Sequence, residues 1–493
     1  MEQIEGPPCS FTVEEITAEL GKLKSRKAGD LLGLKVELVR WGGQTLLQYV
    51  SRFFGEVCKD GLPREWTFRK VVSLYKTGPR TEPSSYRTIM IGNVFSKIFG
   101  RILETRLNSW CEENAVRTPA QAGFRKSFST LDHVLTLRVL MENAQRNHEP
   151  LYLLFVDFSK AFVTVSRSRL GDRLSELGVP EELRNAISQL YQVVTAKVSQ
   201  HDDGVLSTLG VIHGCSLSPT LFGLFIDSLY DLTENQNLGV LLGSLRIGIL
   251  LFADDIVLVA KDPDQMRTHI DNLTSFCEET GSPTYYYWQR RAVSLSRLKL
   301  LSPPYSFLGE SKVRIRSDTP HRRDPVPSAA QLQAEVVQLT AFCESSGMKV
   351  NLIKTMWMQI GGDSGMSLAF QGENIKKCLV YKYLGLEFAS SLRWTACIQS
   401  RSKYGLRALF SFFGKCKEIY LVEWKVRKRL FNTLIQSVML YGAPVWGPAL
   451  PRTSWKLLER VQKLFLQEEL GVRSQIPYDL LLLETGRLPI EVD

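Results

Sequence analysis

Apolar runs with the length of β-strands stand at several points in the middle of the chain. Residues 151–156 form an unbroken run (LYLLFV), and residues 247–252 and 256–260 form two more on either side of a pair of acids. Runs of this length, rich in Leu, Ile and Val, are typical of strands buried on both faces. We therefore expect a buried sheet whose strands end near these acids.

Elsewhere the spacing of apolar residues favours helices. Ile16, Leu20 and Leu23 recur at helical spacing after Thr12, a residue type that commonly caps a helix N-terminus. Helical spacing also occurs over 94–113 and 130–145 and from 399 onward, whereas 71–76 and parts of 349–388 read as strands. The mixture predicts an α+β fold.

Three acidic residues follow the predicted strands. Asp157 comes directly after the first run, and Asp254 and Asp255 stand between the two later runs, where a tight hairpin would turn. Burying neighbouring carboxylates is costly unless a cation or hydrogen-bond donors neutralise them. Three carboxylates at strand ends suit a pair of Mg²⁺ ions, which bind oxygen ligands and stabilise both oxygens of a phosphoryl transfer. The alternative is a surface Asp-Asp turn, because Asp is common in turns.

The composition is that of a globular protein with a basic surplus. The chain has 493 residues, of which 44% are hydrophobic, and a formal net charge of +10, which favours an acidic partner such as nucleic acid. Its nine cysteines include no C-x-x-C pair, so we expect reduced thiols. No apolar run has membrane-spanning length and no signal peptide is evident, so we expect an intracellular protein without a membrane segment.

The C-terminal region carries many basic residues. We expect most of them to form a solvated face and a minority to touch phosphates, where each contact adds salt-sensitive affinity. They are Arg401, Lys403, Arg407, Lys415, Lys417, Lys425, Arg427, Lys428 and Arg429.

One stretch interrupts the pattern. Residues 282–327 contain six prolines, more basic than acidic residues and no sustained periodicity. The segments 273–281 (LTSFCEETG) and 339–347 (LTAFCESSG) are near-copies, as in a partial duplication. We expect 282–338 to be an inserted loop or disordered segment; a basic nucleic-acid-binding arm and a spurious stretch of sequence are the alternatives.

Taken together, the motifs resemble those of LINE-type (non-LTR) retrotransposon reverse transcriptases. Two of them carry the acids: DFSKAF at 157–162 and FADD at 252–255 resemble the metal-binding motifs of that family. The others are YRTI at 86–89, QAGFR at 121–125, GVIHGCSLSP at 210–219, GMKVN at 347–351 with Lys354, YKYLG at 381–385 and LYGA at 440–443. Each motif alone is weakly specific, but the set in this order is strongly specific.

The resemblance implies an α+β fold of the right-hand polymerase type, with fingers, palm and thumb. The implied segments are 1–60 for a helical N-terminal extension, 61–150 for the fingers, 151–281 and 339–390 for the palm, 282–338 for the insertion and 391–493 for a helical thumb and C-terminal segment.

The resemblance also implies a reaction, in which dNTPs are added to a DNA primer on an RNA template with two Mg²⁺ ions, or Mn²⁺ as an alternative. Asp157, Asp254 and Asp255 would bind the metals, and Lys354 would donate a proton to the leaving pyrophosphate. A nuclear location is suggested by the family alone.

Further roles follow from the same resemblance. Phe158 would cover the triphosphate through its backbone, and the bulky Phe162 would clash with a ribose 2′-hydroxyl and so select deoxynucleotides. The remaining assignments are Lys76, Arg87 and Gly214 for the nucleotide, Gln121, Gly123 and Arg125 for the template, and Tyr383, Leu384 and Gly385 for the primer. Without the family, Phe162 reads as an ordinary core aromatic, and the basic residues read as solvated surface charge.

Several positions depart from the pattern of the family. Val163 stands where the family has an acid, and Ile212-His213 stand where it has a basic or polar pair. Ser216 replaces a proline, and Thr88 replaces the proline of the family motif Tyr-Arg-Pro-Ile. The alternative interpretation is therefore a catalytically decayed remnant that only binds nucleic acid. A further and weaker alternative is an RNA-dependent RNA polymerase. Phe252-Ala253 before the acids and the bulky Phe162 argue against it.

Overall fold

The computed structural model describes residues 10–27, 29–76, 78–81, 85–197, 204–280, 348–362, 365–472 and 475–490. The chain divides into two compact units, each assembled from separate stretches. The first unit comprises residues 1–117, 160–225 and 275–349, and the second comprises 118–159, 226–274 and 350–493. The expected insertion at 282–338 lies outside the described residues.

The first unit begins with helices that start where the sequence predicts. Thr12 caps α1 (Val13–Lys22): the Glu15 N–H donates to Thr12 Oγ1 and the Thr12 N–H donates to Glu15 Oε2, both at 3.1 Å, which satisfies two otherwise unpaired donors. The Asn93 side chain caps α5 (Val94–Glu113), which spans the predicted residues. The other helices of this unit are α2 (Val36–Arg40), α3 (Gly43–Asp60), α4 (Arg64–Thr67), α7 (Ala161–Thr164), α8 (Arg167–Glu176), α9 (Glu181–Gln192) and most of α10 (Ser218–Ile226).

Aromatic side chains join these helices. Phe54 of α3, Trp66 of α4 and Phe99 of α5 are buried, and their ring centroids lie 5.4–5.9 Å apart in edge-to-face or tilted pairs. Such pairs contribute about 0.5–1.5 kcal/mol each beyond their burial. The aromatic residues of α3 and α4 therefore pack against α5.

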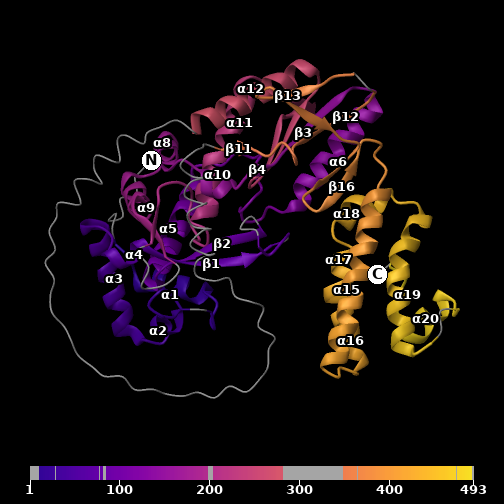
Figure 1. The fold of residues 1–493 in the computed structure, drawn as a ribbon, viewed down its shortest axis with the longest axis horizontal. Helices are drawn as coiled ribbons and strands as arrows, with labels where there is room; N and C mark the ends of the chain where they lie inside the picture. Colours follow the sequence, from indigo (N-terminus) through magenta and orange to yellow (C-terminus); the bar gives the residue numbers. More distant parts are fainter. Residues whose placement is uncertain are drawn as a thin grey trace. The chain divides into compact units, whose positions relative to one another are not determined.

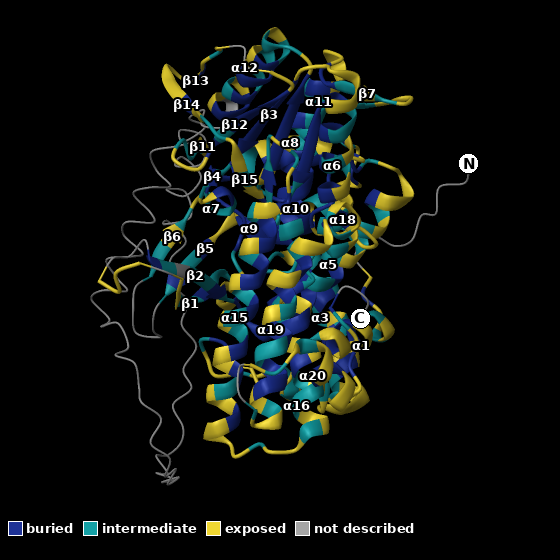
Figure 2. Ribbon diagram, turned by 90° about the vertical axis from the view of Figure 1, so that its right-hand side faces the viewer, coloured by how far each residue is buried: buried dark blue, intermediate teal, exposed yellow. Residues whose placement is uncertain are grey.

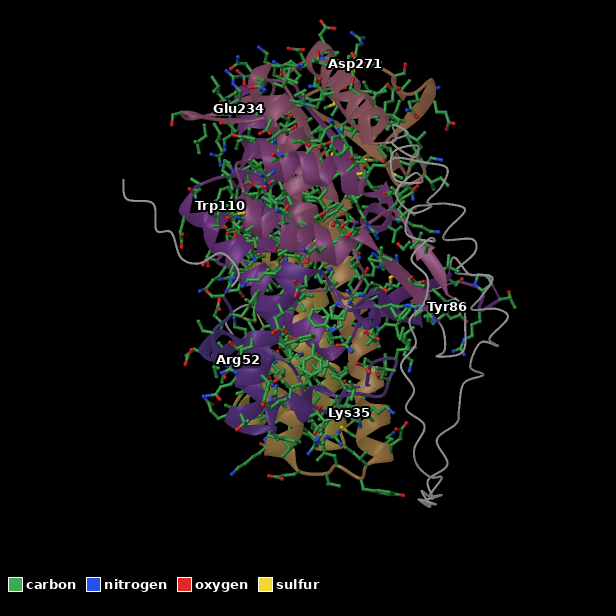
Figure 3. All side chains as sticks on the ribbon, turned by 90° about the vertical axis from the view of Figure 1, so that its left-hand side faces the viewer. Lys35, Arg52, Tyr86, Trp110, Glu234 and Asp271 are labelled. Atoms are coloured by element: carbon green, nitrogen blue, oxygen red, sulfur yellow. The ribbon has the colours of Figure 1, made fainter. Side chains whose placement is uncertain are left out.

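The sheet of the first unit has the strand order β2-β1-β5-β6. Its strands are β1 (Phe68–Tyr75), β2 (Tyr86–Ile91), β5 (Val194–Lys197) and β6 (Val205–Ser207). β1 begins earlier than the predicted 71–76, because Phe68, Arg69 and Lys70 pair with β5 from far along the chain. At the other end of β1, the ring of Tyr75 lies 5.7 Å from that of Tyr86, the β2 residue labelled in Figure 3.

β3 (Leu151–Val156) is central to the main sheet of the second unit. All of its residues are buried, as the dark blue strand in Figure 2 shows. It pairs antiparallel with β10 (Asp255–Ala260) and β12 (Met356–Ile360) along its two edges. Because successive residues point to opposite faces, the burial of all six shows that both faces meet protein, as the unbroken apolar run predicts. The order is β13-β14-β12-β3-β10-β9, with β9 (Ile249–Phe252), β13 (Leu368–Phe370) and β14 (Glu373–Lys377).

The helices of the second unit share one core with this sheet. Leu137 and Met141 of α6 (Thr130–Asn147) belong to the same buried cluster as Phe155 of β3, and α15 (Thr395–Glu418) runs beside α19 (Arg452–Leu470) (Figure 1). The remaining helices are α11 (Ser228–Asn235), most of α12 (Pro263–Thr280), α16 (Trp424–Leu430), η2 (Phe431–Gln436), α17 (Ser437–Met439), α18 (Ala443–Trp446), η3 (Gly447–Ala449) and α20 (Tyr478–Thr485). Within the described ranges, no helix has both the length and the apolar character needed to cross a membrane.

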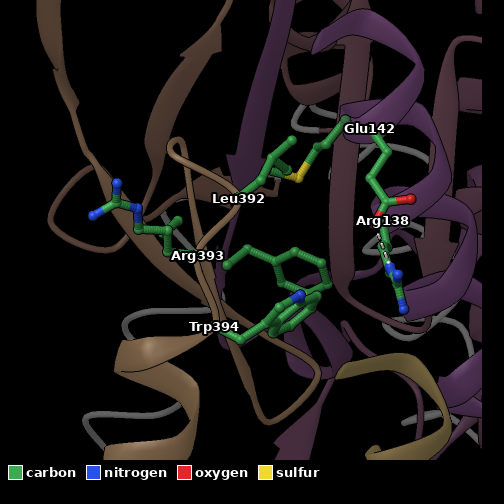
Figure 4. A pocket seen from close by; sticks show the side chains of 8 residues that line it. Arg138, Glu142, Leu392, Arg393 and Trp394 are labelled. Carbon is green, nitrogen blue, oxygen red and sulfur yellow. Dashed lines mark hydrogen bonds and ion pairs between the residues drawn. The ribbon is translucent and has the colours of Figure 1, made fainter. Parts of the chain in front are cut away.

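The remaining strands of the described residues are short. They are β4 (Phe158–Ser159), β7 (Val240–Leu242), β8 (Leu245–Ile247), β11 (Lys349–Val350), β15 (Val380–Tyr383) and β16 (Leu386–Ala389). The end of β16 and the residues that follow it, 388–394, pack against α6 and leave a hollow of about 10 Å³, no larger than one water, beside the ion pair of Arg138 and Glu142 (Figure 4). This hollow is a packing contact and not a ligand site.

Two of the basic residues expected on a solvated face are not solvated. Arg401 is buried, and Arg427 forms an ion pair with the buried carboxylate of Glu469 at 2.5 Å. The expectation of a solvated face concerned most of the nine basic residues, and these two are exceptions. Helical periodicity alone does not reveal them, because it does not show which side of α15 or α16 the rest of the unit covers.

Candidate active site

Two of the three acids lie at the same end of two neighbouring strands. β10 pairs with β3 so that Ile256 faces Val156, and Asp255 and Asp157 are the next residues of the two segments beyond this pair. Because Phe252 pairs with Asp255, the predicted hairpin is confirmed, and its turn consists of Ala253 and Asp254. The three acids therefore share one end of the sheet.

The β9–β10 turn has an unusual backbone that a distant side chain supports. Ala253 has φ +57°, in the left-handed region that few residues other than glycine adopt. Its N–H donates to Oε1 of Gln121 at 3.0 Å, and the Gly123 N–H donates to the same oxygen at 2.8 Å. Gln121 is fully buried, and its Nε2 donates to Asp227 Oδ1 at 3.5 Å. The sequence predicts a template contact for Gln121, whereas in the structure its side chain holds the turn that carries Asp254.

The neighbouring template candidates also shape this region. A Cβ at Gly123 would lie 2.3 Å from the nitrogen of Ala253, so only glycine allows this close approach. Arg125 donates through Nη1 to the carbonyl oxygens of Thr118 at 2.9 Å and Gln121 at 3.3 Å. Both residues thus define the path of the loop beside the β9–β10 turn, and a template contact by Arg125 stays a prediction.

Asp157 is held by the segment that carries Lys354. Its carbonyl oxygen accepts from the Asn351 N–H at 2.7 Å, and its own N–H donates to Thr355 Oγ1 at 3.2 Å. The Lys354 ammonium lies 3.3 Å from Asp157 Oδ2, with side chains that are 57% and 26% exposed respectively. The structure therefore brings together Asp157 and Lys354, which the sequence separates by almost two hundred residues.

The acids repel one another. Partial burial, together with the charges of Asp254 and Asp157, raises the pKa of Asp255 to about 6, while the charge of Lys354 opposes the shift. Burial, together with Asp157 and Asp255, also raises the pKa of Tyr381 to about 12. Negative charge concentrated in this way favours a bound cation.

The arrangement suits a divalent metal ion, although it does not form a closed cage. Among the described residues, no three His, Cys, Asp or Glu side chains stand close enough to hold one ion between them. Mg²⁺ commonly binds one or two carboxylates and completes its shell with water and substrate phosphates, so a preformed cage is not required. The Lys354 ammonium on Asp157 shows that this carboxylate accepts a cation. The carboxylates of this site are therefore suited to bind a divalent metal ion.

Comparisons with known proteins agree with this chemistry. Residues 75–284 match the family "Reverse transcriptase (RNA-dependent DNA polymerase)". The chain is 28% identical over 223 residues to a "Retrovirus-related Pol polyprotein from type-1 retrotransposable element R2" of Nasonia vitripennis. The aligned stretch covers 44% of this chain and 21% of that protein. Residues 75–284 are thus similar to reverse transcriptases, and these relatives are proteins of retrotransposable elements. The carboxylates at the end of β3 and in the β9–β10 hairpin lie within the matched residues.

Other relatives extend the similarity beyond the matched residues. A "Putative 115 kDa protein in type-1 retrotransposable element R1DM" of Drosophila melanogaster is 24% identical over 98% of this chain, which covers 41% of that protein. A "Probable RNA-directed DNA polymerase from transposon BS" of the same species is 24% identical over 52% of this chain and 28% of its own length. The chain thus spans between about a fifth and two-fifths of these relatives.

In the absence of metal, replacing Asp255 with Asn should stabilise the folded chain. The substitution removes a carboxylate that its neighbours repel. Because much of the surface of this residue still faces water, the repulsion is screened, and we expect a gain of about 1 kcal/mol and a rise of about 2 °C in Tm at pH 7.5 with EDTA. As the pH falls, Asp255 becomes protonated near pH 6 in the folded chain, but only at a lower pH in the unfolded chain. Protonation removes the repulsion, so the two Tm values should converge as the pH falls from 6 towards 4. Mg²⁺ should raise the wild-type Tm more than that of the variant; equal shifts would contradict a metal site here.

The nucleotide candidates of the first unit have varied surroundings. Lys76 is exposed at the end of β1, and its N–H donates to the Ser85 carbonyl at 2.7 Å. Gly214 has φ +96°, and a Cβ there would lie 2.9 Å from the Met90 carbonyl oxygen, so this position requires glycine. Arg87 belongs to β2, opposite Leu74, and its side chain lies outside what the structure describes. In the second unit, Phe158 is buried in β4, which leaves its backbone as the group able to meet a ligand.

The primer candidates form the turn between β15 and β16. Leu384 and Gly385 occupy its two central positions with φ +45° and +86°. The Leu384 carbonyl accepts from the Tyr441 hydroxyl at 3.0 Å, and the Gly385 carbonyl accepts from Nη2 of the buried Arg401. Tyr383 points inward, and its hydroxyl lies 3.3 Å from His133 Nδ1. Side chains from helical segments thus fix both carbonyls of the β15–β16 turn.

Removal of the Tyr441 hydroxyl should weaken primer–template binding. Tyr441→Phe loses the bond to Leu384 and the 2.8 Å contact with Thr130 Oγ1. Hydrogen bonds of this kind contribute about 0.5–1.5 kcal/mol each, so we expect the Kd for a fluorescent RNA–DNA primer–template to rise about threefold to tenfold. Tyr420→Phe, in an exposed position, should leave the Kd unchanged. Equal affinities for all three proteins would remove the β15–β16 turn from the primer site.

The sequence predicts no supporting role for several residues that build this region. Thr355 holds the end of β3, Arg401 and Tyr441 hold the β15–β16 turn, and Tyr381 donates to the Lys354 carbonyl at 3.3 Å. Thr355, Tyr381 and Tyr441 lie inside or beside recognised motifs, which is the only signal that could have found them. Arg401 has no such signal.

Proposed function

We propose that this chain is the RNA-directed DNA polymerase segment of a non-LTR retrotransposon protein, and that it transfers nucleotides from dNTPs to a primer 3′-hydroxyl. The observation that carries the proposal is the cluster of Asp157, Asp254 and Asp255 at one sheet end, where partial burial and the neighbouring negative charges raise the pKa of Asp255. This cluster lies within a domain that matches reverse transcriptases.

The three carboxylates would bind two Mg²⁺ ions, or Mn²⁺ as the alternative. When bound, the ions would activate the primer hydroxyl and stabilise the leaving pyrophosphate. Lys354, whose ammonium lies beside Asp157, would donate a proton to the leaving group. The β9–β10 turn, fixed by Gln121, would keep Asp254 in place through the reaction, so that catalysis depends on positioning and electrostatics.

We assign the parts of a right-hand polymerase by the same reasoning. The sheet of the second unit would be the palm, the β1–β2 hairpin part of the fingers, and the helices from α15 onward the thumb. RNA template, DNA primer and dNTPs would be the partners, and Phe162 would select deoxynucleotides. By analogy with the retrotransposon relatives, we propose that the protein acts in the nucleus.

The deciding experiment is dNTP incorporation on a primed RNA template with and without Mg²⁺. Incorporation by the wild type and its loss in an Asp254→Ala/Asp255→Ala double variant would support the proposal. Incorporation that survives the double substitution would refute it. A folded wild type that binds the primer–template but incorporates nothing would identify a decayed remnant instead.

A further inference from the structure

The ring of Phe162 does not stand alone in the first unit. It lies parallel to the ring of Phe222, with centroids 4.5 Å apart and planes inclined by 10°. Phe222 belongs to α10 and is completely buried, so it cannot move without disturbing the core. One face of Phe162 is therefore fixed against a rigid partner.

A second contact restricts the same ring from another side. The imidazole of His213 lies 5.7 Å from the centroid of Phe162 at an angle of 68°. His213 is itself fixed, because its Nδ1 lies 3.0 Å from the Thr88 carbonyl oxygen and its own carbonyl accepts from the Met90 N–H at 2.9 Å. The position of Phe162 is thus coupled to β2.

The backbone around Phe162 is tied to the same loop. The Val211 N–H donates to the Phe162 carbonyl at 2.8 Å, and the Gly210 N–H donates to that of Val165 at 2.8 Å. A Cβ at Gly210 would lie 2.6 Å from Cα of Val163. Arg167 holds the preceding loop residues by donating to the carbonyls of Ser207, Leu209 and Gly210. Loop 207–214 and the short helix α7 therefore form one rigid assembly.

Two departures from the pattern of the family meet in this assembly. Thr88 stands where the family has proline, and His213 where it has a basic or polar residue, and in this chain the two are in direct contact. Seen singly, they read as signs of decay. Their contact uses the backbone carbonyl of Thr88, so it is the His213 side chain that links β2 to the ring of Phe162.

We propose that Phe222 and His213 determine sugar selectivity by fixing the ring of Phe162 in the position that excludes a ribose 2′-hydroxyl. This inference rests on the proposed function and deepens its assignment of Phe162. Phe222 and His213 are positioning residues, since they act through Phe162 and not on the nucleotide. A ring that can tilt leaves room for the additional hydroxyl, while the smaller deoxynucleotide is bound as before.

The test compares kcat/KM for dTTP with that for UTP on the same primed RNA template. In Phe222→Leu, which removes the stacked ring but keeps an apolar side chain, the dTTP/UTP ratio should fall about tenfold while kcat/KM for dTTP changes less than threefold. Phe225→Leu is the matched control: Phe225 is buried on the same helix, and its ring packs against Phe276, so the ratio should equal that of the wild type.

His213→Asn provides a second variant in case Phe222→Leu does not fold. Asparagine retains a donor for the Thr88 carbonyl but lacks the ring edge, so the ratio should again fall, by about threefold to tenfold. A wild-type ratio in both variants of an active enzyme would overturn this inference alone. A wild type that incorporates neither nucleotide would overturn the proposed function and, with it, this inference.

Discussion

Replacing Asp157 with Asn is expected to reduce dNTP incorporation on the order of a thousandfold or more. The substitution keeps the shape of the side chain but removes the charge that would bind a metal ion at the end of β3. It also leaves the Lys354 ammonium, now 3.3 Å from Asp157, without its anionic neighbour. The measurement is single-turnover primer extension at saturating Mg²⁺, since this reports the chemical step and not product release.

The fold should survive this substitution. The bonds that hold Asp157 to Asn351 and Thr355 use its backbone carbonyl and N–H, which asparagine provides equally. Asp271→Asn is the matched control, because Asp271 is exposed on α12, where Figure 3 labels it, and its loss should leave incorporation unchanged. An Asp157→Asn enzyme within tenfold of the wild type would show that this carboxylate is not a metal ligand of the reaction.

Local pattern explains why the strands and helix starts could be predicted. The apolar run of β3 identifies a strand buried on both faces, and it places Asp157 directly at its end. The capping box of Thr12 and Glu15 likewise depends on residues only three apart. In such elements the information lies within a few residues, so reading the sequence was sufficient.

The supporting contacts of the site could not be predicted in this way. The bond from Ala253 to Gln121 joins residues 132 apart, and the bond from Tyr441 to Leu384 joins residues 57 apart. Neither Gln121 nor Arg401 carries a signal for burial, because polar side chains are usually exposed. These side chains form hydrogen bonds with backbone N–H and C=O groups that the sheet leaves unpaired. Which groups are left unpaired depends on the whole fold.

The two turns that bear candidate site residues show the same physical solution. Ala253 and Leu384 both have positive φ although neither is glycine, a conformation that persists only where the surroundings stabilise it. In each case a buried or half-buried side chain from a distant segment forms a hydrogen bond with the turn: Gln121 accepts from the Ala253 N–H, and Tyr441 donates to the Leu384 carbonyl. The strained backbone is thus confined to one or two residues of each turn, whereas the hydrogen bond that stabilises it comes from a distant segment of the chain.

Replacing Gln121 with Leu should therefore impair catalysis far more than it impairs folding. The substitution leaves the Ala253 and Gly123 N–H groups without their acceptor, and an unpaired buried donor costs about 1–3 kcal/mol. Ala253 can escape this cost by leaving the left-handed region, which would displace Asp254 next to it.

We expect kcat for dNTP incorporation to fall roughly a hundredfold, as when one precisely held polar group is lost from an active site, and the Mg²⁺ concentration at half-maximal activity to rise. Both should be measured at least 10 °C below the Tm of the variant, so that the protein compared is folded. Gln145→Leu, exposed on α6, is the control and should match the wild type in both quantities. If Gln121→Leu lowered the Tm but kept kcat within threefold and the Mg²⁺ requirement unchanged, Gln121 would support the fold without positioning the metal-binding turn.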